Sequence, residues 1–244
     1  MSQEIVTTLL GTYLFANLTP ADLLPLSDLV TRAKYKQGSA VYRPGDAATA
    51  IHVVTAGRFK EAITSADGDE LTIELLPVGS VFGEVGIFAP EGDRIVSVVA
   101  LEDGEVLTIA REYLVPFLLE HPDSMMRLLG GLVAMIRETT EFASTISFSN
   151  IKDRLAIKLA ELADLHGRAH PRGQLIELAL PQTLLASLVA ANRTNVNRAL
   201  ADLEREGAIS REGRRYVVTD PASLRHSVLA SERLLHRRNN IVKP

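Results

Sequence analysis

Residues 181–207 read PQTLLASLVAANRTNVNRALADLEREG and contain two short helical patterns separated by a turn. Leucine and valine recur at helical spacing over residues 184–189, which predicts a first helix with one apolar face. Ala190-Ala191 permits a tight turn, and Asn192 is a suitable N-cap for a second helix. Apolar residues of that second helix share one face at helical spacing. The stretch therefore predicts a helix-turn-helix.

The opposite face of the second helix carries polar and basic side chains. Arginine bonds to guanine in the major groove of DNA, and amide side chains bond to adenine. A two-stranded wing is predicted over residues 210–218, with basic side chains suited to phosphates. A helical hairpin with merely solvated arginines is the alternative. The predicted DNA-contacting residues are Gln182, Arg193, Thr194, Asn195, Asn197 and Arg198 in the helices and Arg211, Arg214 and Arg215 in the wing.

Charge is divided unevenly along the chain. Residues 1–151 hold 10 basic and 20 acidic residues, a net charge of −10, whereas residues 152–244 hold 16 and 10, a net charge of +6. This asymmetry predicts two domains with different partners, and the basic domain most simply binds nucleic acid. Surface charge that serves only solubility is the alternative.

A heptad stripe precedes the basic domain. Its members step by three and four residues, which is the spacing of a two-stranded coiled-coil seam. We expect this helix to join two copies of the chain, and the alternative is a helix that lies on its own barrel. Ser149-Asn150 ends the stripe and predicts a hinge, followed by a helix over residues 151–163. The expected dimer contacts are Leu129, Leu132, Ile136, Thr139, Ala143 and Ile146.

Residues 33–109 show a different pattern, in which short apolar or alternating runs are separated by turn clusters. Such spacing is typical of a β-barrel or jelly roll. Asp67-Gly68 is a hairpin signal, and the run from Arg94 to Val99 reads as a strand. Residues 1–30 read as helical with a break at Thr19-Pro20, and residues 165–173 read as a loop.

One turn of the predicted barrel carries the groups that a nucleotide needs. Residues 83–88 read GEVGIF, and Arg94 follows Glu84 by ten positions. Glycine lets the backbone approach a ligand closely, a carboxylate accepts hydrogen bonds from sugar hydroxyls, and arginine neutralises phosphate through a planar fork of donors. The pattern favours a nucleotide sensor over a catalyst.

Composition excludes several functional classes. The 244 residues include no cysteine, which rules out disulfides, thiolate-held iron–sulfur clusters and cysteine nucleophiles. The six histidines lack metal-ligand spacing, and no nucleophile–base pair accompanies Glu84 and Arg94, so we expect neither a metal site nor an enzyme. No run approaches the roughly 20 apolar residues of a membrane span, and the N-terminus is a poor signal peptide. We expect a cytoplasmic protein that contacts no membrane.

Barrel, heptad helix, helix-turn-helix and wing follow one another in an order that resembles the cyclic-AMP receptor/FNR family of bacterial transcription regulators. The resemblance covers residues from about 10 to about 220. It implies an α+β fold with an N-terminal double-stranded β-helix (jelly roll) for a cyclic nucleotide, a long dimerisation helix and a C-terminal winged helix-turn-helix. It also implies a homodimer that binds a near-palindromic double-stranded DNA site.

The same resemblance implies cyclic AMP as the effector. Gly83 and Glu84 match ribose-contacting positions, and Arg94 matches the phosphate-binding arginine. Ile95 departs from the family, because that place usually holds a small hydroxyl residue. A different effector, or DNA binding without one, therefore stays open. The expected ligand contacts are Gly83, Glu84, Val85, Arg94, Ile95, Thr139 and Thr140, the last two matching a hydroxyl pair that contacts adenine from both subunits.

In the recognition helix, Arg193 and Arg198 match the family's two base-reading arginines, whereas Thr194 stands where a glutamate is common. The half-site is therefore expected to depart from TGTGA. RNA polymerase is an expected partner, and the predicted loop His166–Gly173 is a candidate for its contact. The alternative of another class is a cyclic-nucleotide-binding regulatory module for a protein partner.

Four segments follow from these patterns. They are a cyclic-nucleotide-binding-like barrel with N-terminal helices (1–111), a dimerisation helix and hinge (112–149), a winged helix-turn-helix (150–220) and a basic C-terminal extension (221–244).

Overall fold

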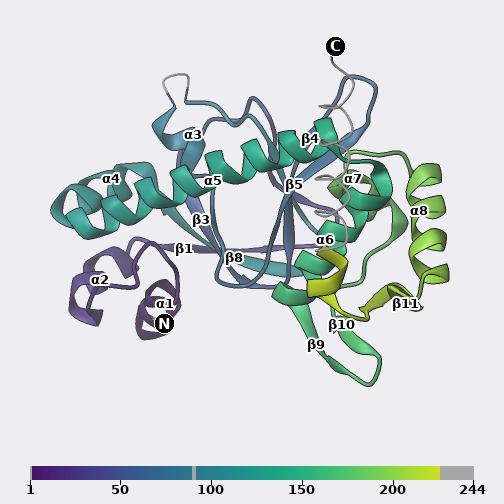
Figure 1. The fold of residues 1–244 in the computed structure, drawn as a ribbon. Helices are drawn as coiled ribbons and strands as arrows, with labels where there is room; N and C mark the ends of the chain where they lie inside the picture. The colour runs from purple at the N-terminus through teal and green to yellow at the C-terminus, as the bar shows by residue number, and fades with distance from the viewer. Residues whose placement is uncertain (1, 90–91, 226–244) are drawn as a thin grey trace, which may run out of the picture. The chain divides into compact units, whose positions relative to one another are not determined.

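The computed structural model describes residues 2–89 and 92–225, and its fold is drawn in Figure 1. The chain divides into two compact units, the first ending at Glu138 and the second beginning at Thr139. Each unit is described by itself below. The predicted C-terminal extension beyond residue 225, with its basic residues, lies outside the described residues.

Two four-stranded antiparallel sheets form the body of the N-terminal unit (Figure 1). The first has the order β1-β8-β3-β6 and the second β2-β7-β4-β5. Buried side chains from both sheets, including Phe59, Phe82 and Val98, pack into one cluster between them. The expected α+β chain with a β-rich N-terminal domain is confirmed. The strands are β1 (Thr31–Tyr35), β2 (Ala40–Tyr42), β3 (Ala50–Ala56), β4 (Phe59–Thr64), β5 (Glu70–Leu76), β6 (Val81–Phe82), β7 (Ser97–Ala100) and β8 (Gly104–Ala110).

Helices pack on the first sheet. Pro20 begins α2 because Thr19 caps it: its hydroxyl accepts from the Asp22 backbone, and the Asp22 carboxylate accepts from the Thr19 backbone. Leu9, Leu14 and Phe15 are fully buried in a cluster that also holds strand residues. The helices are α1 (Ser2–Leu10), α2 (Pro20–Ser27), α3 (Glu84–Phe88), α4 (Arg111–Glu120) and the long α5 (Pro122–Phe148), which continues into the second unit.

In the described part of the C-terminal unit, helices α6, α7 and α8 pack with one sheet of order β11-β12-β10-β9. Asn150 caps α6, because its side chain accepts from the Asp153 backbone at 3.0 Å. Leu159, Leu185 and Leu200, one from each helix, are fully buried with Val217 of the sheet. The elements are α6 (Ile151–His166), β9 (Gly167–His170), β10 (Gly173–Ile176), α7 (Gln182–Leu188), α8 (Arg193–Arg205), β11 (Ile209–Glu212) and β12 (Arg215–Val218).

Two predictions about local structure are wrong. Residues 165–173 do not form a loop: α6 runs to His166, and β9 and β10 then make a hairpin in which Gly173 pairs with His170. Pro171-Arg172 supplies the tight turn, and the strands are too short and polar to show alternation. The strand expected from Arg94 begins at Ser97, because the Arg94 backbone bonds instead to Gly45 and Asp46 in the preceding turn.

None of the helices in the described parts of the chain is long and apolar enough to cross a membrane.

Candidate functional site

The helix-turn-helix forms as predicted from α7 and α8. Ala190 adopts a left-handed conformation (φ 50°), which turns the chain sharply between the two helices. The Asn192 side chain accepts from the Asn195 backbone at 2.9 Å and so begins α8. Val196, Ala199 and Leu200 are buried, so the opposite face of α8 is presented to solvent.

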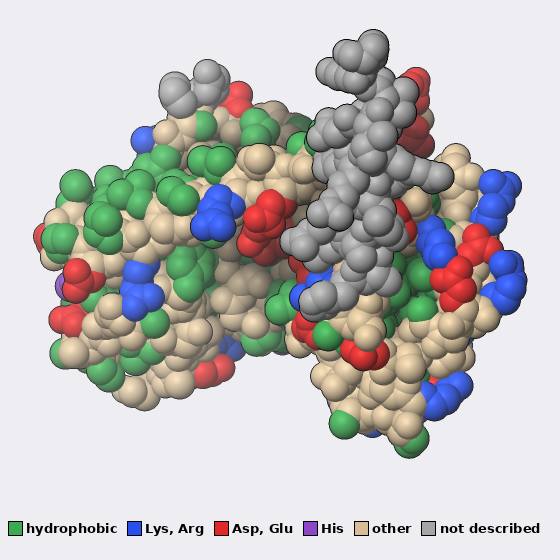
Figure 2. All heavy atoms as spheres, in the orientation of Figure 1, with side chains coloured by type: hydrophobic (Ala, Val, Ile, Leu, Met, Phe, Trp, Pro, Cys, Tyr) green, Lys and Arg blue, Asp and Glu red, His purple; other side chains and the backbone are tan. Residues whose placement is uncertain are grey.

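That outer face holds the predicted base-reading residues. Arg193, Thr194 and Arg198 are exposed, whereas Asn195 and Asn197 are half-buried. Arg193 Nε donates to Gln182 Oε1 at 3.1 Å, so α7 orients the first arginine of α8. Figure 2 shows Lys and Arg side chains over α8, with acidic side chains among them.

The wing is the β11–β12 hairpin, in which Glu212 pairs with Arg215. Arg214 and Arg215 are exposed. Arg211 Nε lies 3.3 Å from the Glu204 carboxylate, and its guanidinium lies 5.5 Å from the Tyr216 ring. Arg211 is therefore partly neutralised within the chain.

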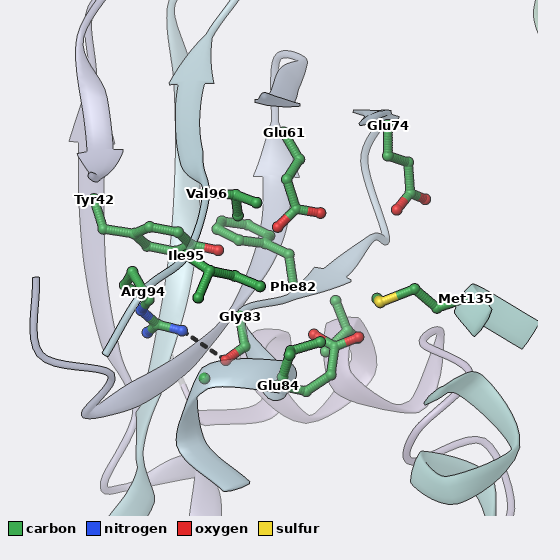
Figure 3. Close-up of a pocket in the computed structure, with 13 residues that line it drawn as sticks. Tyr42, Glu61, Glu74, Phe82, Gly83, Glu84, Arg94, Ile95, Val96 and Met135 are labelled. Carbon is green, nitrogen blue, oxygen red and sulfur yellow. Dashed lines mark hydrogen bonds between the residues drawn. The ribbon is translucent and has the colours of Figure 1, made fainter. Parts of the chain in front are cut away.

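A pocket in the N-terminal unit brings together five of the seven predicted ligand residues, Gly83, Glu84, Val85, Arg94 and Ile95 (Figure 3). The other two, Thr139 and Thr140, are not among the residues that line it. Its cavity volume is about 30 Å³, which is room for a water or two. Ile95 is 69% exposed at its edge. The lining residues are Tyr42, Glu61, Glu74, Val81, Phe82, Gly83, Glu84, Val85, Gly86, Arg94, Ile95, Val96 and Met135.

Arg94 is bound to the barrel wall. Its Nη1 donates to the Gly83 carbonyl at 2.6 Å, and its Nη2 donates to the Ala50 carbonyl. The guanidinium carbon lies 4.2 Å from the centre of the Tyr42 ring, a cation–π contact. Burial lowers the pKa of Arg94, and its Nε is buried without a hydrogen-bond partner in the described structure. Two of the donors that a phosphate needs are thus engaged by backbone.

Glu84 begins α3 and is 5% exposed. Burial raises the pKa of its carboxyl, although a hydrogen bond from Tyr13 and the charge of Arg94 act in the opposite direction. The Tyr13 ring packs against Gly131 of α5, where an added Cβ would lie 3.0 Å from the ring. Tyr13 therefore links the pocket carboxylate to the long helix.

Glu61 and Glu74 are neighbours across β4 and β5, with their Cα atoms in register. A bulge follows Glu61, and it brings Glu74 opposite it rather than Ile73. Burial, together with the charges of Glu74 and Glu84, raises the pKa of Glu61 to about 7, and the charge of Arg94 acts in the opposite direction. Both carboxylates point into the pocket in Figure 3.

The long helix α5 exposes an apolar stripe. Leu129 and Ile136 of the predicted seam are 47% and 65% exposed, and Met126 and Val133 are exposed with them at steps of three and four residues. Leu132 is half-buried instead. Figure 2 shows hydrophobic side chains gathered over the N-terminal half of α5. Further along the helix the expected dimer contacts Thr139, Ala143 and Ile146 are also exposed, as is Thr140, which was expected to contact the ligand.

The described residues contain no group of three or more His, Asp or Glu side chains that could hold a metal ion.

Comparison with known proteins identifies both units. Residues 32–121 match the cyclic nucleotide-binding domain, and residues 153–227 match the Crp-like helix-turn-helix domain. The chain is 30% identical over 199 residues to the cyclic AMP receptor protein of Thermus thermophilus, covering 82% of this chain and 88% of that protein. The chain belongs to the CRP/FNR family. It is a DNA-binding transcription regulator.

Further members show how broadly this CRP/FNR fold is used. A CRP-like cAMP-activated global transcriptional regulator of Mycobacterium tuberculosis is 26% identical over 86% of this chain and 94% of its own. The global nitrogen regulator of Synechococcus elongatus is 27% identical over 78% and 86%. The c-di-GMP-responsive regulator CLP of Xanthomonas campestris shares the fold with a TM-score of 0.73, at 24% identity over 82% of this chain and 99% of that chain. These relatives are named as regulators rather than enzymes.

Several pocket residues of this CRP/FNR regulator were not predicted from the sequence. Glu61, Glu74, Tyr42, Met135 and the nearby Tyr13 come from elements far apart in the chain. The Asp67-Gly68 hairpin signal places β4 beside β5 but, without the bulge, pairs Glu61 with Ile73. The two carboxylates could be found together only from the structure.

Gly83→Ala is expected to destabilise this CRP/FNR regulator and to displace Arg94. Gly83 has φ 88°, and a Cβ there would lie 2.7 Å from Arg94 Nη1. Gly79→Ala is the matched control, since Gly79 has φ 92° with no atom within 4 Å of a Cβ. We expect a loss of about 1–2 kcal/mol for Gly79→Ala, from backbone strain alone, and of about 2–4 kcal/mol for Gly83→Ala in urea unfolding. Equal losses would contradict the close contact.

Proposed function

We propose that two copies of this regulator bind a near-palindromic duplex, each placing α8 in a major groove. The observation that carries this is the orientation of Arg193 by Gln182 on the solvent face of a capped helix. The first turns of a recognition helix contact base edges, and arginine is the usual reader of guanine. Thr194 offers a contact to a thymine methyl where a glutamate would accept from cytosine, so the half-site is proposed to differ from TGTGA.

The homodimer is proposed to form through α5. Its exposed stripe keeps the three-and-four spacing of a coiled-coil seam, and apolar side chains with 47–65% exposure need a partner surface. The family relatives support dimer formation. With the domain boundaries proposed from the sequence, residues 112–149 supply this helix and residues 150–220 the DNA-binding domain.

The effector is proposed to be a cyclic nucleotide, with cyclic AMP as the first candidate. The domain match supports the class. Gly83, Glu84 and Val85 would meet the ribose, and Arg94 the phosphate after it exchanges a backbone carbonyl for the ligand. Thr139 and Thr140 would supply hydroxyls to the base. Because relatives are named both as cAMP-activated and as nitrogen regulators, family membership alone does not select the effector.

A second candidate is DNA binding that needs no effector. The specific observation in its favour is that Arg94 is already bound by two carbonyls in a pocket of about 30 Å³. The side chain of Ile95 has no hydrogen-bond donor for a phosphate.

RNA polymerase is proposed as a further partner, and the cytoplasm as the place where both partners lie. The β9–β10 hairpin is a candidate contact, because Arg168 and Arg172 are exposed on it. Arg172 pairs with Glu212 at 2.6 Å, which fixes the hairpin to β11.

Fluorescence-anisotropy titration of labelled duplex at rising salt, with and without cyclic AMP, tests the proposal. We expect the logarithm of the binding constant to fall linearly with the logarithm of the salt concentration. Arg215→Ala should reduce the steepness of this line by about 1.8 for a dimer, at about 0.9 per phosphate contact. Arg211→Ala should change it less, since Glu204 already pairs with Arg211.

The outcomes separate the alternatives. Binding that strengthens with cyclic AMP supports the effector, and unchanged binding favours the effector-independent regulator. Failure to bind duplex even at low salt would contradict the DNA-binding role and leave a regulatory module for a protein partner. Equal slopes for the two wing variants would contradict the assignment of Arg215 to phosphate.

A further inference from the structure

The pocket has an unusual charge balance for a site that takes an anion. Glu61, Glu74 and Glu84 line it, and among the described lining residues Arg94 alone carries positive charge. A phosphate would add another negative charge to a partly buried site that already holds three carboxylates. Like charges in a low-dielectric site repel strongly unless one of them is neutralised.

The two carboxylates that create this imbalance face each other across β4 and β5. Glu61 and Glu74 are in register, a like-charge cross-strand arrangement that destabilises a sheet pair. The neighbouring lysine does not relieve it, because Lys60 pairs with Glu70. Glu61 is the more buried of the two, whereas Glu74 is exposed.

Among the described residues around Glu61, Arg94 supplies the counter-charge, and two of its donors are bound to the carbonyls of Gly83 and Ala50. Tyr42 of β2 and Glu84 of α3 also face Glu61, and its β7 partner Val98 is apolar. Close by, burial lowers the pKa of His52 to about 3, so this ring stays neutral between pH 6 and pH 8.

We propose that Glu61 and Glu74 are specificity-determining residues that select against anionic ligands, so that a cyclic nucleotide binds only when Glu61 takes up a proton from solvent. This inference rests on the proposed function, because it concerns the pocket that would hold the effector. Neutral Glu61 removes one repulsive charge from the pocket. The protonation state of the Glu61 carboxyl then sets the affinity for the nucleotide.

Because the pKa of Glu61 lies at about 7, its protonated fraction falls about tenfold between pH 6 and pH 8. Calorimetric titration of the full chain with cyclic AMP should therefore show about tenfold weaker binding at pH 8 than at pH 6. Adenosine, which lacks the phosphate, serves as the neutral probe and should bind with the same affinity at both pH values.

Glutamine variants remove the charge of these carboxylates and keep the shape of the side chain, so they test whether charge sets the affinity. E61Q should bind cyclic AMP at least tenfold more tightly than the wild type at pH 8, with an affinity that no longer depends on pH. E74Q should give a smaller gain, because Glu74 is exposed. E102Q in the turn between β7 and β8, outside the pocket lining, is the control and should keep the wild-type profile.

A wild-type affinity that is flat from pH 6 to pH 8 would overturn the inference. So would the absence of cyclic AMP binding in the wild type and in both pocket variants, because the carboxylates would then not be the barrier. Either result can coincide with intact sequence-specific binding of duplex DNA, which is measured separately and tests the proposed function itself.

Discussion

Arg193→Ala is expected to weaken binding of the selected DNA site by about 30-fold to 10⁴-fold. Each well-placed arginine–guanine pair contributes about 1–3 kcal/mol, and a symmetric dimer loses two such pairs, about 2–6 kcal/mol together. Binding to unrelated duplexes should change far less, because phosphate contacts supply most of it. Anisotropy titration of the selected and a scrambled duplex at one salt concentration measures both.

Arg205→Ala is the control for the Arg193 prediction, because Arg205 lies at the far end of the same helix and pairs with Asp202 at 2.9 Å. It should leave the affinity for the selected site within about twofold. Gln182→Ala should cost less than Arg193→Ala, since it removes only the hydrogen bond that orients the arginine. Equal losses on selected and scrambled DNA for Arg193→Ala would show that this residue contacts phosphate rather than base.

The double variant Leu129→Glu, Ile136→Glu is expected to convert the dimer to a monomer. Both side chains are exposed on the apolar stripe of α5, where two copies would bury them against each other. Four carboxylates placed in one such interface would lack partners, and the cost of burying them exceeds the free energy that a short seam provides. Sedimentation equilibrium over a range of protein concentrations measures the change.

Ala134→Glu tests the same charge on a different face of α5, since Ala134 is exposed and lies off the stripe. It should remain dimeric and bind the selected site normally. The double variant should lose at least 100-fold in affinity for that site, because a monomer engages one half-site only. A double variant that sediments as a dimer would place the dimer contact elsewhere.

Some features of the fold and of the candidate site could be predicted from the sequence. The helix-turn-helix could be predicted because its signals are local: Asn192 caps α8, and apolar residues recur at helical spacing. The position of Gly83 and Arg94 in one pocket was also accessible, because the resemblance carried both residues together.

Other features depend on tertiary context. The bulge after Glu61 shifts the β4–β5 register by one residue, and the alternation of apolar and polar residues in the two strands does not predict it. The attachment of Arg94 to the Ala50 carbonyl joins residues 44 positions apart. Leu132 fits the heptad spacing yet is half-buried, because the stripe alone does not say which side of α5 its own domain covers.

Selection of the full-length protein against a pool of random duplexes tests the central claim most directly. We expect enrichment of sequences with two-fold symmetry, whose half-sites lie one helical turn of DNA apart, about 10 base pairs. We also expect these half-sites to differ from TGTGA. Recovery of no preferred sequence, or of a single half-site without symmetry, would contradict a dimeric regulator that reads DNA through α8.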